Sequence, residues 1–147
     1  MRHLLTACAF LGLAGCLEVG DPLLAVRDTT PPTVQSTDPG ANATIGSDGT
    51  LKVTFSELMD VRTLRPGIAV FSGRDEVPLR IIVPSDTSVD ENVERGDFSE
   101  TVMVNADAED GHFPANALLT LVLRTSLTDY EGNAVVEEVR VPFRTGP

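Results

Sequence analysis

The sequence has no tryptophan, one tyrosine and only two cysteines among its 147 residues. Both cysteines lie near the amino terminus, Cys8 within an apolar run and Cys16 shortly behind it. The chain beyond Cys16 contains no thiol, which excludes a disulfide framework and cysteine catalysis there. The shortage of large aromatic rings also argues against a site that stacks on sugars. The fold must therefore be stabilised by packing and hydrogen bonds.

Side chains that act as general bases are equally scarce. Beyond residue 16 the chain has one histidine, His112, and one lysine, Lys52. His112 lies in the turn-like segment 110–114, which predicts a solvated loop position. Nucleophile elbows, His-Glu-x-x-His helices and glycine-rich phosphate loops are absent from the sequence. We therefore expect no enzymatic activity and no required cofactor.

The chain opens with a positive start and a short apolar run. Arg2 and His3 precede the apolar residues 4–13, and the sequence Leu13-Ala14-Gly15-Cys16 closes this segment. The run falls short of the roughly 20 residues that span a bilayer. Its layout is that of a secretory signal peptide over residues 1–15. The closing residues resemble the lipobox of bacterial lipoproteins.

The lipobox resemblance implies cleavage before Cys16 and attachment of lipid to this cysteine. Acyl chains such as palmitate then hold the protein to a membrane, since each buried methylene contributes about 0.8 kcal/mol. Leu17 and Glu18 follow, with no aspartate directly after the cysteine. By the same resemblance, this favours the outer membrane of a cell envelope. A freely secreted domain is the alternative, and orientation toward the periplasm or the cell surface stays open.

The charge is strongly acidic, with 22 Asp and Glu against 11 Lys and Arg. This excess argues against nucleic acid and against direct adhesion to anionic headgroups, both of which require basic patches. Residues 16–30 show no sustained period and are interpreted as the lipidated cysteine and a tether. Fully extended, the tether reaches at most about 50 Å. Residues 31–146 then form a single domain.

Period-two alternation dominates the domain and predicts antiparallel strands. The alternating segments are 51–56, 79–83, 101–106, 119–124 and 139–144, with two weaker strands at 33–37 and 68–71. About seven strands in a domain of this size indicate an all-β fold, a sandwich of two packed sheets. Pro142 has no N–H to donate, so it is expected at an edge or a bulge.

One short helical piece is expected at residues 57–64. Ser56 is its predicted cap, and Pro66-Gly67 is its predicted stop. Met59 and Leu64 are expected to point into the sandwich as core residues.

Five short motifs occur in order along residues 31–146. They are Pro31-Pro32-Thr33-Val34 with Ser36-Thr37-Asp38-Pro39; Lys52-Val53-Thr54-Phe55-Ser56-Glu57-Leu58-Met59-Asp60; Asn116 to Leu123; Thr128-Asp129-Tyr130-Glu131-Gly132-Asn133-Ala134; and Val141-Pro142-Phe143-Arg144-Thr145-Gly146. With these motifs the segment resembles the bacterial immunoglobulin-like (Ig-like) domains of the S-layer, or SbsA, type. The resemblance implies an Ig-like β-sandwich that serves as a spacer, structural or adhesive module without chemistry.

Five residues in these motifs have structural roles that can be predicted without the family resemblance. Gly132 and Asn133 tolerate positive φ in a tight turn, and Asp129 is expected to bond backbone amides two residues on. Glu57 and Asp60 are three apart, so on a helix they share one face near its amino end.

Calcium is the one metal that the composition favours, because it binds six to eight oxygen ligands. Two acidic regions offer carboxylates: Asp86, Asp90, Glu91, Glu94 and Asp97 in the first, and Asp107, Glu109 and Asp110 in the second. The second departs from an EF-hand, since its glycine stands at Gly111 and Asn116 replaces the final glutamate. A loop calcium site is the hypothesis, and a solvated acidic loop is the alternative.

The expected protein is an envelope lipoprotein that displays an Ig-like structural or adhesion module. Cys16 attaches it to the membrane, and loops or a sheet edge contact an envelope protein or a polysaccharide. Two alternatives stay open: an accessory docking subunit of a larger envelope complex, and a calcium-dependent carbohydrate-binding module.

Overall fold

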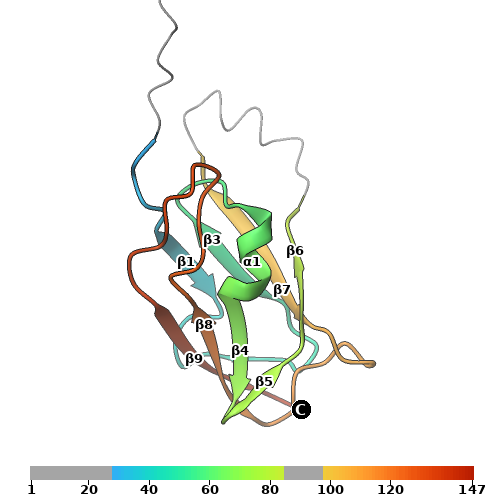
Figure 1. The fold of residues 1–147 in the computed structure, drawn as a ribbon. Helices are drawn as coiled ribbons and strands as arrows, with labels where there is room; N and C mark the ends of the chain where they lie inside the picture. The colour runs from blue at the N-terminus through green and yellow to red at the C-terminus, as the bar shows by residue number, and fades with distance from the viewer. Residues whose placement is uncertain (1–27, 85–97) are drawn as a thin grey trace, which may run out of the picture.

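Two β-sheets face each other in the computed structural model, which describes residues 28–84 and 98–147 (Figure 1). The four-stranded sheet has the order β1-β3-β7-β6, and the five-stranded sheet has the order β2-β9-β8-β4-β5. The strands are β1 (Val34–Asp38), β2 (Thr44–Ile45), β3 (Leu51–Phe55), β4 (Ile68–Ser72), β5 (Asp75–Val77), β6 (Leu79–Ile82), β7 (Glu100–Ala106), β8 (Leu118–Leu123) and β9 (Val139–Thr145). The predicted all-β Ig-like sandwich is confirmed.

The chain crosses repeatedly from one sheet to the other, whereas β4–β5, β6–β7 and β8–β9 are neighbours within one sheet. Neighbours pair antiparallel, except that β2 runs parallel to β9, with Thr44 opposite Arg144. All seven predicted strands are present. The strands β2 and β5 were not predicted, because two or three residues are too few for an alternation to show.

The core lies between the sheets and follows the predicted alternation. In β3 the side chains of Leu51, Val53 and Phe55 are fully buried, while Lys52 is exposed. The inward positions of β7, β8 and β9 meet them from both sheets, and buried apolar residues form one contiguous cluster. Period-two patterning therefore fixes which face of each strand is removed from water.

The short helix begins later than predicted. Helix α1 (Val61–Gly67) has Asp60 as its N-cap, and the Asp60 side chain accepts from the Arg62 N–H. The expected cap at Ser56 is wrong, because that hydroxyl is bonded to the start of β1. Pro66 lies inside the last turn of α1, and the helix ends at Gly67, so the predicted stop at Pro66-Gly67 is confirmed although the helix runs past the expected end at Leu64.

Because the helix starts at Val61, Glu57 precedes it and does not share a helical face with Asp60. Met59, between them, forms an isolated antiparallel bridge with Asp129. Met59 and Leu64 are both buried in the core, as expected.

Pro142 lies in β9 on the side that faces β2. Its carbonyl accepts from the Asn42 N–H, and two residues on the Arg144 N–H donates to the Ala43 carbonyl. The pairing of β9 with β2 begins only at Arg144, so the missing N–H of Pro142 falls beyond this two-residue edge strand. The expected edge location is confirmed.

No helix within residues 28–84 and 98–147 has the length and apolar character to cross a membrane.

Candidate functional site

Ser56 fastens the start of β1 to the end of β3. Its N–H donates to the Thr33 carbonyl at 2.9 Å, and its hydroxyl oxygen accepts from the Thr33 N–H at 2.9 Å. The first two motifs of the sequence therefore meet in space and close one end of the four-stranded sheet.

Asp60 connects α1 to the loop after β8. Its Oδ1 accepts from the Arg62 N–H at 2.9 Å, and its Oδ2 lies 2.6 Å from Arg62 Nη2. The hydrogen bonds from Arg62 hold the pKa of the Asp60 carboxyl below its usual value. The Asp60 N–H donates to the Thr128 carbonyl at 2.9 Å. One aspartate thus orients the helix and fixes the adjacent loop.

Asp129 organises the loop after β8 from a buried position, with 1% of its surface exposed. Its Oδ1 accepts from the Asn133 N–H at 2.8 Å, and its Oδ2 accepts from Asn133 Nδ2 at 2.7 Å. The bonded amide is four residues on, where two were expected. Gly132 takes the predicted left-handed position, with φ of +88°. Asn133 Nδ2 also donates to the Asp28 carbonyl at 3.1 Å, which ties this loop to the first described residue.

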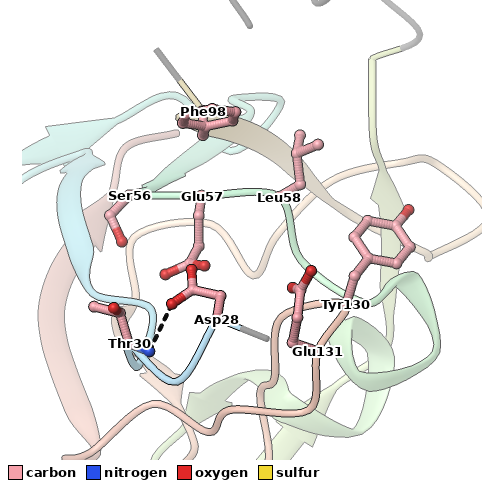
Figure 2. A pocket seen from close by; sticks show the side chains of 8 residues that line it. All are labelled: Asp28, Thr30, Ser56, Glu57, Leu58, Phe98, Tyr130 and Glu131. Atoms are coloured by element: carbon pink, nitrogen blue, oxygen red, sulfur yellow. Dashed lines mark hydrogen bonds between the residues drawn. The ribbon is translucent and has the colours of Figure 1, made fainter. Parts of the chain in front are cut away.

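An open hollow of about 530 Å³ lies at this end of the sandwich (Figure 2). We call it the N-terminal hollow; it is lined by Asp28, Thr30, Ser56, Glu57, Leu58, Phe98, Tyr130 and Glu131. Figure 2 shows the carboxyl groups of Glu57 and Asp28 close together at its centre. Phe98 and Tyr130 are 49% and 62% exposed at its rim. The surface combines apolar rings with negative charge.

Glu57 carries the chemistry of the N-terminal hollow. Partial burial raises the pKa of its carboxyl, and the negative charges of Asp129, Asp28 and Glu131 raise it further. Glu57 therefore takes up a proton more readily than a solvated glutamate does. The described lining includes no histidine, cysteine or lysine.

Glu100, at the start of β7, was not identified from the sequence. Its carboxylate accepts from the Met59 N–H at 2.8 Å, and burial raises its pKa. A glutamate in a strand carries no sequence signal for this role, since the bond joins positions 41 residues apart.

A second hollow, of about 560 Å³, lies at the opposite end, and we call it the C-terminal hollow. Its lining includes Ser47, Asp75, Asp110, His112 and Phe113. His112 is exposed, as expected for a loop position. Phe113 is buried and packs edge-to-face on Phe143, with ring centroids 6.3 Å apart.

Thr145 fastens this second end. It is 4% exposed, and its hydroxyl donates to the Pro114 carbonyl and accepts from the Ala117 N–H. The neutral side chain of Thr145, in the last sequence motif of the domain, therefore fixes the loop before β8.

Of the calcium candidates, Asp86, Asp90, Glu91, Glu94 and Asp97 lie outside the described residues, as does Cys16. Asp107, Glu109 and Asp110 are exposed in the loop after β7. Asp110 Oδ1 accepts from the His112 N–H at 3.0 Å, and Asp107 lies 3.9 Å from Arg80. Within the described ranges no three acidic, histidine or cysteine side chains are grouped to hold a metal. Calcium binding stays a prediction, which calorimetric titration with calcium tests.

The model of the bacterial Ig-like domain family matches residues 28–145 of this chain. None of the curated proteins matches it. Among solved structures, the crystal structure of the S-layer protein rSbsC is similar at 17% identity and a TM-score of 0.48. That match covers 80% of this chain and 14% of the other.

Proposed function

Because the chain belongs to the bacterial Ig-like domain family, we propose that it is an outer-membrane lipoprotein whose Ig-like sandwich is a structural or adhesion module. The module binds an envelope protein or polysaccharide and catalyses no reaction. The observation that carries this proposal is the order of two features, a segment that resembles a lipobox and ends at Cys16, and a sandwich whose first strand begins at Val34.

The geometry supports an orientation for the anchored domain. Eleven residues separate Cys16 from Asp28, so the two residues lie at most about 40 Å apart. Asp28 lines the N-terminal hollow at one end of the sandwich (Figure 2). The membrane then lies on this side, and the C-terminal hollow and the β4–β5 turn face outward.

The anchor is tested by labelling with an alkyne analogue of palmitate in a bacterial host that processes lipoproteins. We expect the wild-type protein to be labelled and to sediment with membranes, and Cys16→Ser to lose both properties. The mass of the extracted protein should correspond to a chain that begins at Cys16 and carries acyl groups. An unlabelled chain that begins elsewhere contradicts the lipoprotein proposal.

The interaction role is tested by crosslinking in intact envelopes, followed by recovery of the protein. Retention of one stoichiometric protein, or of polysaccharide, supports a binding module. Recovery of the protein alone, at crosslinker levels that capture known envelope complexes, contradicts it. Protease added to intact cells then distinguishes a surface-facing domain from a periplasmic one.

A further inference from the structure

Within residues 28–84 and 98–147, strand β6 pairs on one side only, with β7. The Asp107 N–H donates to the Pro78 carbonyl at 2.8 Å, and Arg80 and Ile82 stand opposite Asn105 and Met103 of β7. Because hydrogen-bonded positions alternate in an antiparallel pair, the backbone groups of the residues between them point away from β7. The Ile81 N–H and carbonyl therefore lie on the outer edge of the four-stranded sheet.

Helix α1 lies along this edge and leaves a groove. Arg65 Nη2 donates to the Leu79 carbonyl at 3.3 Å, so the helix covers the first outward position of β6. Farther along, a groove of about 260 Å³ is lined by Val61, Leu64, Arg65, Arg80, Ile81 and Val83. We call it the α1–β6 groove. Val61 is 52% exposed at its rim, an apolar side chain that the domain itself leaves in water.

The α1–β6 groove is positively charged in an acidic protein. Both charged residues in its lining are arginines, Arg65 and Arg80, although the chain has twice as many acidic as basic residues. In the described ranges Arg65 has no carboxylate within ion-pair distance, and Arg80 has only Asp107 at 3.9 Å. That exposed pair is weak, and the bond from Arg65 to the Leu79 carbonyl uses only Nη2, so both guanidinium groups keep N–H donors for a partner.

We infer that an acidic, extended segment of a partner protein adds to β6 as a further strand in the α1–β6 groove. Its backbone pairs with Ile81, its apolar side chains contact Val61 and Val83, and its carboxylates meet Arg65 and Arg80. The alternating N–H and carbonyl of a strand edge match a polypeptide, which favours a protein over an acidic polysaccharide. This inference rests on the proposed interaction function and names its surface.

The test uses blocked eight-residue peptides of alternating valine and aspartate, titrated into the full chain and followed by amide NMR shifts. We expect shifts centred on Ile81 and Val83, and no binding of the valine–lysine peptide. Methylating the peptide nitrogens on one edge should weaken binding about tenfold more than methylating those on the other edge, since only one edge pairs with β6. Equal effects from the two methylated peptides overturn strand addition.

Two charge-matched variants complete the test. R65E/R80E should weaken binding of the valine–aspartate peptide about tenfold or more. R74E/R144E, which reverses two exposed arginines outside the groove, should bind as wild type. Equal loss in both variants overturns the inference, as does binding of polygalacturonate in place of the peptide.

Envelope crosslinking separates this inference from the proposed function. Wild type should capture a partner that R65E/R80E does not. If R65E/R80E captures the same partner as wild type, the groove inference fails and the interaction function stands. If neither protein captures a partner, the interaction function itself fails.

Discussion

The two ends of the sandwich differ in the side chain that holds the closing loop, which is a carboxylate at one end and a neutral hydroxyl at the other. At the N-terminal hollow, the buried carboxylate of Asp129 holds its loop, and Glu57 lies among acidic neighbours. At the C-terminal hollow, the neutral hydroxyl of Thr145 holds the loop, and Phe113 fills the space below it. The comparison teaches that one end should respond to pH, whereas the stability of the other depends on packing.

The largest expected effect is at the packed end. Phe113→Ala should lower the free energy of unfolding by about 3–5 kcal/mol, because it leaves a cavity against Phe143. Urea denaturation measures the change. The matched control is Phe98→Ala at the other end, where the ring is 49% exposed and the expected loss is below about 1 kcal/mol. Equal losses would show that the two ends do not differ in packing.

The second largest effect is expected for Asp129→Ala, which should lower the free energy of unfolding by about 2–3 kcal/mol. The substitution removes the acceptor for both the backbone N–H and the side-chain amide of Asn133. Thermal unfolding and hydrogen exchange at the Asn133 amide measure the effect. An unchanged exchange rate would mean that Asp129 does not hold this loop.

Thr145→Val should cost about 1–2 kcal/mol, because the isosteric side chain leaves the Pro114 carbonyl and the Ala117 N–H without their partner. Thr145→Ser keeps the hydroxyl and serves as the control. The loss for valine should be the same at pH 5 and pH 8, since no charge is involved. A loss of stability that differs between pH 5 and pH 8 would contradict the view that this end is held without charged groups.

The smallest expected effect is an increase in the free energy of unfolding. Burial and neighbouring carboxylates raise the pKa of Glu57 in the folded protein above its ordinary value of 4.5. The folded state therefore keeps a proton that the unfolded chain has lost, and stability falls as pH rises through that interval. Glu57→Gln should be more stable than wild type at pH 7 by less than about 1 kcal/mol, since solvent screens this partly exposed group.

The gain from Glu57→Gln should disappear below about pH 4, where both forms of the protein carry a neutral side chain at this position. Glu100, whose pKa burial also raises, is present in both proteins, so its contribution cancels in the comparison. Parallel urea curves at pH 4 and pH 7 measure this. A difference of the same size at both values would mean that Glu57 does not titrate as described.

Most of the fold was predictable from the sequence because alternation over five or more residues directly records burial. The strands β3, β7, β8 and β9 all show it, and Met59 and Leu64 were placed correctly in the core. The helix start was not predictable in the same way. Ser56 and Asp60 are both good caps in isolation, and only the bond between Ser56 and Thr33, 23 positions apart, decides between them.

The site was less predictable than the fold. The sequence indicated Asp129, Gly132 and Asn133 as a turn, and the turn is present. It did not indicate the N-terminal hollow, because Asp28, Glu57, Phe98 and Tyr130 meet only when four separate segments converge. Nor did it indicate the α1–β6 groove. Arg65 and Arg80 are 15 positions apart in the sequence, and only the fold brings them into the lining of one groove.

The order of strands in the four-stranded sheet has a mechanical consequence. β1, which follows the proposed membrane tether, and β6, with the proposed partner edge, are the two edge strands of the same sheet. Tension between membrane and partner would cross β3 and β7 without passing through the loops. The hydrogen bonds between neighbouring strands run perpendicular to the strands. A pull along the strand direction therefore loads many of these bonds in shear at the same time and does not break them one by one.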